Sequence, residues 1–97
     1  MSADSPVRSI LAWVRDYGAT VVEDDPIEGV ERHYSRDPLT GMYLERIVDV
    51  IAGSPDSVRK LSKEEGESLL AGLCGILELR LADGSVIHQR GKILPPG

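Results

Sequence analysis

The side chains best suited to chemistry in this sequence are one thiol, Cys74, and two imidazoles, His33 and His88. A cysteine nucleophile needs a base and an orienting group beside it in space. Cys74 follows a leucine-rich stretch, which predicts a small buried hydrophobic residue rather than a reactive thiolate. Neither histidine has another histidine or cysteine at zinc-ligand spacing. We therefore expect no catalytic residue, no metal site and no cofactor.

A second candidate for chemistry is a run of carboxylates that no basic residue interrupts. A hard cation such as calcium needs several oxygens converging on one point, and the ligand pattern of a helix–loop–helix calcium site is absent. The run therefore predicts a solvated acidic loop or, as a functional alternative, a docking surface that imitates a nucleic-acid backbone and binds a basic partner. Its members are Glu23, Asp24, Asp25, Glu28 and Glu31.

The aromatic residues Trp13, Tyr34 and Tyr43 are a third candidate, because Trp and Tyr concentrate binding energy at interfaces. The chain contains no Phe, so these residues are also needed for packing. We predict that both tyrosines belong to the core or its edge. Trp13 lies at the edge of an apolar stripe, and we take it with the acidic run as a predicted partner contact.

Residues 36–43, RDPLTGMY, resemble the short segment that opens diguanylate cyclase domains. The resemblance covers roughly seven residues and would imply a helix that starts near Thr40. Those domains also need a Gly-Gly-Asp/Glu-Glu-Phe turn to hold nucleotide and metal, and this chain has neither Phe nor a Gly-Gly pair. We therefore predict a hairpin turn, in which Pro38 presets the first central position and Gly41 adopts positive φ.

Other functional classes lack their signatures. The sequence has no phosphate-binding glycine loop and no nucleophile elbow. A formal net charge of −5 argues against general binding to nucleic acids or anionic membranes, because phosphate recognition needs a basic surface. With no signal peptide and no long apolar run, a cytoplasmic location is expected.

Two segments show helical patterns. In residues 5–18, Ser5 is the expected N-cap, Pro6 the first helical residue and Gly18 the terminating residue. In residues 61–75, Ser62 and Glu65 form the pattern of a capping box, and leucines supply the buried face.

The remaining segments predict strands and turns. Residues 19–23, 30–35 and 42–51 are expected strands, with a turn at 24–29 and a break at 53–57. Residues 76–94 predict a second hairpin around a two-residue Asp83-Gly84 turn, which would place His88 opposite Leu79.

The predicted fold is α+β, a mainly antiparallel sheet of about five short strands packed against two helices, in the order α-β-β-β-α-β-β. Residues 1–97 form one domain, with 1–4 and 95–97 as flexible ends. The predicted function is a small acidic protein-interaction module without enzymatic activity. It would be a modulator, adaptor or inhibitor, such as a phage or another mobile element encodes, with a protein partner or a second copy paired through sheet edges. A small-molecule-binding domain or a subunit of a phage or secretion assembly is the alternative.

Overall fold

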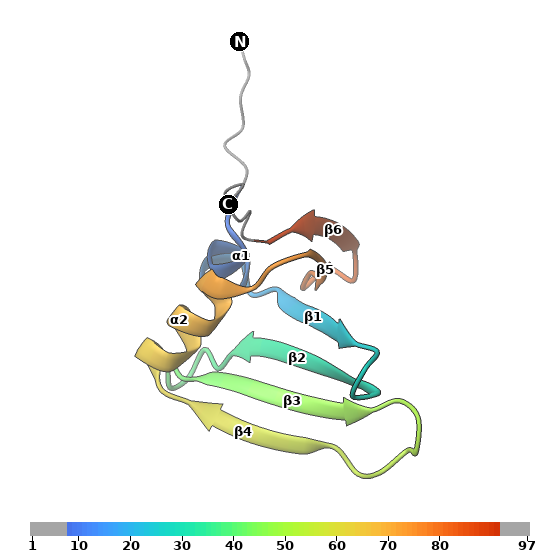
Figure 1. Ribbon diagram of the computed structural model, residues 1–97. Helices are drawn as coiled ribbons and strands as arrows, with labels where there is room; N and C mark the ends of the chain where they lie inside the picture. The colour runs from blue at the N-terminus through green and yellow to red at the C-terminus, as the bar shows by residue number, and fades with distance from the viewer. Residues whose placement is uncertain (1–7, 92–97) are drawn as a thin grey trace, which may run out of the picture.

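The computed structural model describes residues 8–91, which form an α+β domain and confirm the predicted class (Figure 1). The predicted flexible ends, 1–4 and 95–97, lie outside the described residues. All six strands join one antiparallel sheet, in the spatial order β4-β3-β2-β1-β5-β6. The elements are α1 (Ile10–Tyr17), β1 (Thr20–Asp25), β2 (Val30–Arg36), β3 (Tyr43–Asp49), β4 (Ser57–Leu61), α2 (Lys63–Gly72), β5 (Ile76–Arg80) and β6 (Val86–Arg90).

The turn between β2 and β3 confirms the hairpin prediction. The Asp37 carboxylate accepts hydrogen bonds from the Leu39 N–H at 2.9 Å and from the Thr40 hydroxyl at 3.1 Å. Gly41 takes a φ of 76°, in the left-handed region that favours glycine. The chain therefore reverses at this point, and the following residues continue as β3.

Residues 8–91 form six strands where about five were predicted, and the additional strand is β4. Residues 57–61 begin at the last residue of the predicted break and form the outer strand beside β3, with Tyr43 opposite Leu61. Only Leu61 of β4 is buried. An edge strand that is mostly exposed lacks the alternation of apolar and polar residues that identifies a strand in a sequence.

Both helices are capped by serine. In α2, the Ser62 hydroxyl accepts from the Glu65 N–H at 3.1 Å, as predicted. In α1, Ser9 has this role and accepts from the Ala12 N–H at 3.0 Å. The helix therefore begins at Ile10, later than predicted, and Ser5 and Pro6 lie outside the described residues.

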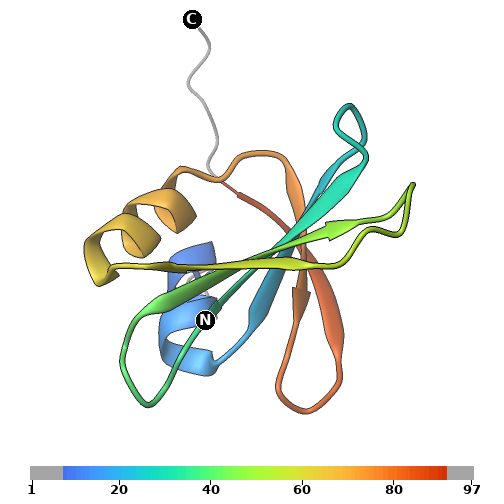
Figure 2. The same ribbon diagram turned by 90° about the horizontal axis from the view of Figure 1, so that it is seen from below.

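The two helices cover one face of the sheet and only part of its length. Figure 1 shows α1 and α2 over the end of the sheet where β3 begins, while the opposite ends of β1 to β4 extend past them. Seen from below in Figure 2, these far ends and the β5–β6 hairpin project away from the helices. The buried core lies between helices and sheet: Ile10, Val14, Ala19, Val21, Tyr34, Tyr43, Leu61, Leu70, Leu73, Leu77 and Leu79.

Helix α2 connects the two sides of the sheet and lies directly on Tyr43. It follows β4 at one edge and leads to β5, which pairs with β1. A side chain at Gly66 would overlap the Tyr43 ring. The Tyr43 hydroxyl donates to the Glu67 carboxylate at 3.2 Å. Both predicted core tyrosines, Tyr34 and Tyr43, are buried.

The second hairpin differs by one residue from its predicted register. The Leu81 N–H donates to the Ser85 carbonyl at 2.8 Å, which leaves three residues in the loop instead of two. Gly84 supplies the positive φ that such a loop requires. As a result, His88 lies opposite Glu78 and not opposite Leu79. The first strand also runs further than predicted, through Asp25.

The contact between α2 and Tyr43 predicts opposite effects for two alanine substitutions in one helix. Gly66→Ala should lower the free energy of unfolding by at least about 1 kcal/mol, because overpacking against the ring outweighs the gain in helix propensity. Gly72→Ala is the matched control, since a Cβ there meets no atom within 4 Å. It should leave stability unchanged or raise it by up to about 1 kcal/mol. Urea unfolding measures both, and a stabilised Gly66→Ala protein would contradict the packing.

The burial of Tyr34 predicts a loss of stability at alkaline pH. Burial, together with the neighbouring Glu45 carboxylate, raises the pKa of Tyr34 above its ordinary value. Above about pH 10 the unfolded tyrosine loses its proton while the folded one keeps it, so stability falls as pH rises. Tyr34→Phe should reduce the decrease in the free energy of unfolding with pH, the slope between about pH 9 and pH 11. Urea unfolding across that range measures it, and an unchanged slope would show that Tyr34 does not contribute.

Candidate functional site

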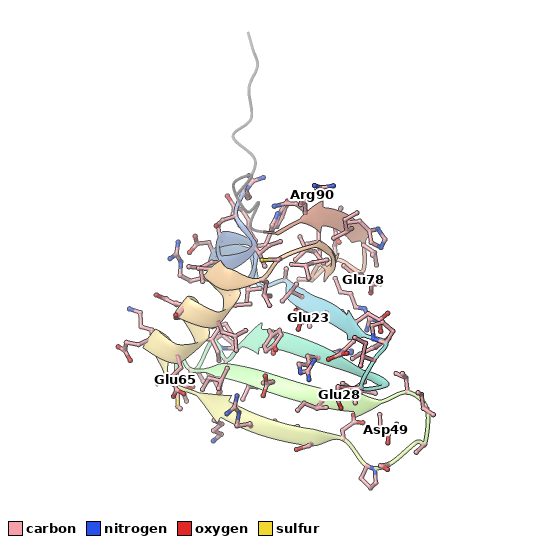
Figure 3. All side chains as sticks on the ribbon, viewed as in Figure 1. Glu23, Glu28, Asp49, Glu65, Glu78 and Arg90 are labelled. Carbon is pink, nitrogen blue, oxygen red and sulfur yellow. The ribbon has the colours of Figure 1, made fainter. Side chains whose placement is uncertain are left out.

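The end of the sheet that the helices leave uncovered carries a mixed apolar and acidic surface. It combines the β1–β2 turn with the β3–β4 loop. We call it the distal patch, and it comprises Asp24, Ile27, Glu28, Val50 and Ile51, all exposed. Figure 3 shows Glu28 and the adjacent Asp49 together at this end, whereas Glu65 lies at the helical end.

The two loops of the distal patch are attached to each other. The Val50 N–H donates to the Gly29 carbonyl at 3.2 Å. The Ile51 side chain lies directly over Gly29, where any Cβ would overlap it. Asp49 accepts hydrogen bonds from the Ile51 and Ala52 N–H groups at 3.1 and 2.8 Å, which shapes the second loop. The patch is therefore a surface with a defined shape and not two independent loops.

One residue of the predicted acidic run, Asp25, contributes to the structure of the turn. Its carboxylate binds Arg32 at 2.8 Å and accepts from the Glu28 N–H at 3.1 Å. The hydrogen bond from Arg32 is the main cause of a lowered pKa at Asp25. This pairing orders the β1–β2 turn and leaves Asp25 less available to a partner.

The other members of the run lie on both faces of the sheet. Glu31 is paired with His33, with 3.1 Å between Oε1 and Nε2. Glu23 lies opposite Arg32 in the sheet and is only partly exposed. Its side chain is on the same face as the helices, at the end of the sheet that they do not cover. Asp24 and Glu28 are exposed, and neither is in an ion pair with another residue of 8–91. The structure thus brings two of the five carboxylates into the distal patch.

Trp13, the predicted aromatic contact, lies far from the acidic run in the fold and is half-buried. Its indole N–H donates to the Gln89 side chain at 2.9 Å, which joins α1 to β6. The Arg8 guanidinium lies over the Trp13 ring, 5.1 Å from its centre. The tryptophan therefore supports the junction of helix and sheet edge, and it does not form one surface with the carboxylates.

The expectation that Cys74 is buried was wrong. Cys74 lies in the connection from α2 to β5, and its side chain is exposed. Its thiol is 3.4 Å from the Gly72 carbonyl. The leucines that suggested burial lie in α2 and at position 73. Cys74 follows them, where the chain turns toward solvent.

The two histidines lie on the face of the sheet opposite the helices. His33 is in β2 and His88 in β6, within one row of residues that crosses the sheet through Val22 and Glu78. Three strand spacings separate them, about 14 Å. Among residues 8–91, no three His, Cys, Asp or Glu side chains are grouped to hold a metal ion.

The face of the sheet opposite the helices also contains a cavity of about 430 Å³, which we call the open-face hollow. Its size falls within the range of small-molecule pockets. No local sequence pattern indicates it, because its residues come from five strands and two adjoining loops and are brought together only by the register of the sheet. The hollow is lined by Gly18, Thr20, His33, Ser35, Leu44, Arg46, Val58, Arg80, Leu81 and Ala82.

No protein-family model, curated protein or solved structure matches this chain. No helix among the described residues is long and apolar enough to cross a membrane. The two most distinctive surfaces of residues 8–91 are the distal patch and the open-face hollow.

The exposure of Cys74 predicts rapid labelling of the native protein by a thiol reagent. The native rate should be within about tenfold of the rate in denaturant, because access is not limited by unfolding. Absorbance with a chromogenic disulfide reagent measures both rates. A native rate that is slower by several orders of magnitude would place the thiol in the interior and contradict its position.

Proposed function

We propose that this protein is a small acidic interaction module without enzymatic activity, a modulator, adaptor or inhibitor that binds another protein through the distal patch. The observation that carries the proposal is the exposure of large apolar side chains beside unpaired carboxylates. Ile27 is 93% exposed and Ile51 is 78% exposed. Glu28 follows Ile27 directly in the β1–β2 turn, and Asp24 lies at the end of β1 that leads into this turn.

The distal patch has the composition of a small interface. Such surfaces have an apolar centre that becomes dry and a polar rim that stays in contact with water. Burying one isoleucine side chain contributes roughly 1.5–3 kcal/mol. Val50 extends the apolar centre at the second loop, and Asp24 and Glu28 form the acidic rim.

The charge of the rim identifies the chemistry of the partner. Carboxylates at the rim favour a partner that presents lysine or arginine around an apolar pocket. The formal net charge of −5 adds a longer-range attraction to the same kind of surface. The proposed partner is thus a protein with a basic, partly apolar docking site.

The proposal of a non-enzymatic role is supported by the separation of the reactive side chains. Cys74, His33 and His88 lie on a loop and on two separate strands. A nucleophile and its base must be within hydrogen-bonding reach of each other. A role as a subunit of a larger assembly predicts symmetric oligomers, which light scattering would detect.

Self-association through sheet edges is a second form of the same function. Within residues 8–91, the edge strands β4 and β6 each have one side without a neighbouring strand. In β4, Arg59 and Lys60 are exposed, and charges of this kind oppose edge-to-edge pairing. The edge of β6 is therefore the better candidate for pairing with a second copy.

The distal patch is tested by Ile27→Ser combined with Ile51→Ser. Retention of the partner on the immobilised protein, from a lysate of the source cells, should fall by about tenfold or more, because central apolar contacts dominate interface energy. The matched control is Leu39→Ser, since Leu39 is also 93% exposed but lies in the β2–β3 turn at the opposite end. Quantitative mass spectrometry measures retention.

A charge-reversed protein, Asp24→Lys with Glu28→Lys, tests the basic character of the partner. It should retain less of the same protein, and the difference should shrink as salt is raised, because salt screens exposed charges. Equal retention by the double serine variant and the Leu39→Ser control would contradict binding at the distal patch. Equal retention by the charge-reversed protein would contradict a basic partner.

A further inference from the structure

The open-face hollow has a lining suited to a small organic anion, and we propose that it binds a molecule with an anionic head group and a short aliphatic portion. This site is separate from the distal patch and does not depend on the proposed protein-binding function. The hollow lies on the face of the sheet opposite the helices, toward the end of the sheet where β1 begins and β5 ends.

The hollow arises from the sizes of neighbouring side chains. Thr20 and Ser35 occupy adjacent positions on β1 and β2 and have short side chains, so they form a low floor. The register places Arg80 beside Thr20 and Leu44 beside Ser35. Longer side chains therefore stand on both sides of this floor, and the space between them is the cavity.

The charged residues that line the hollow are cationic. Arg46 comes from β3 and Arg80 from β5, separated by three strand spacings and by two residues along the strands, about 16 Å at the backbone. His33 on β2 lies beside Arg46, and its ring is paired with Glu31, which does not line the hollow. No carboxylate lines the hollow, although the whole chain carries a formal net charge of −5. An anion is therefore the charged group that this site accommodates.

Each arginine keeps donors for a ligand. Arg80 uses its Nε to bind Glu78 in the same strand. Arg46 meets Asp56 through Nη1 at 4.0 Å, the outer limit of an ion pair. Neither acidic residue lines the hollow. A guanidinium has five N–H donors, so each arginine can bind a carboxylate or phosphate while remaining positioned by its neighbour.

The polar floor and the apolar walls define the rest of the ligand. The hydroxyls of Thr20 and Ser35 can donate to an anionic oxygen. Leu44 and Val58 on one side, and Leu81 on the other, offer apolar surface to an aliphatic chain. A site with a few convergent polar groups and apolar walls is typical of small-molecule recognition. The ligand class is thus an aliphatic carboxylate or an aliphatic phosphate ester.

Titration with three probes of equal chain length tests the proposal: hexanoate, hexyl phosphate and n-hexanol. Amide chemical shifts from two-dimensional NMR report where each probe binds. We expect hexanoate or hexyl phosphate to shift the amides around Thr20, Ser35, Arg46 and Arg80, and the stronger of the two identifies the head group. The neutral alcohol should bind much more weakly, because it cannot pair with the guanidiniums.

Two exposed arginines allow the charge to be removed without disturbing the core. Arg46→Gln and Arg80→Gln should each weaken binding of the anion by about fivefold or more. Arg90→Gln is the control, since Arg90 lies in the edge strand β6 (Figure 3) and does not line the hollow. It should change the affinity by less than about twofold.

Three results would overturn the proposal. The first is no shift at tens of millimolar of either anion. The second is equal binding of n-hexanol. The third is an affinity for the anion that changes as little in Arg46→Gln and Arg80→Gln as it does in Arg90→Gln. Thermal unfolding of each variant establishes that it is folded, so that lost binding reports the site and not the stability of the protein.

Discussion

The fold depends on the close approach of α2 to the ring of Tyr43, which the absence of a side chain at Gly66 permits. This helix has to carry the chain from β4, at one edge of the sheet, to β5 beside β1. By lying flat on Tyr43 it covers one end of one face and meets α1 there. A helix of ten residues is about 15 Å long, so it cannot cover the full length of strands β1 to β4.

The limited coverage explains where the candidate sites lie. The far ends of β1 to β4 remain outside the helical layer, and their connecting loops place Ile27 and Ile51 in solvent. The opposite face has no covering layer among the described residues, so its side chains are arranged by the sheet alone. Antiparallel sheets tolerate such an open face when it is sufficiently polar. Here, Val22 is nevertheless buried on that face by its neighbours.

Local sequence signals were sufficient where a turn or cap decides the structure. Asp37 and Gly41 predicted the first hairpin, and Ser62 predicted the start of α2. Strand β4 was missed because only Leu61 of it faces the core, and the loop of the second hairpin has three residues where Asp83-Gly84 suggested two. The distal patch was partly predicted from its carboxylates. Its isoleucines, the pairing of Asp25 with Arg32 and the open-face hollow depend on contacts between distant segments, which no local pattern contains.

The two proposed sites show that net charge describes this protein poorly. The formal value of −5 suggests an acidic surface throughout. In the sheet, however, Arg46, Arg80 and His33 line one cavity without a carboxylate, whereas Asp24 and Glu28 lie at the tip formed by the β1–β2 turn and the β3–β4 loop. Charges separated by more than a Debye length, about 8 Å in physiological salt, act nearly independently. The proposed basic partner at the tip and the proposed small anion on the open face are therefore compatible in one domain, because each would respond to its local charges and not to their sum.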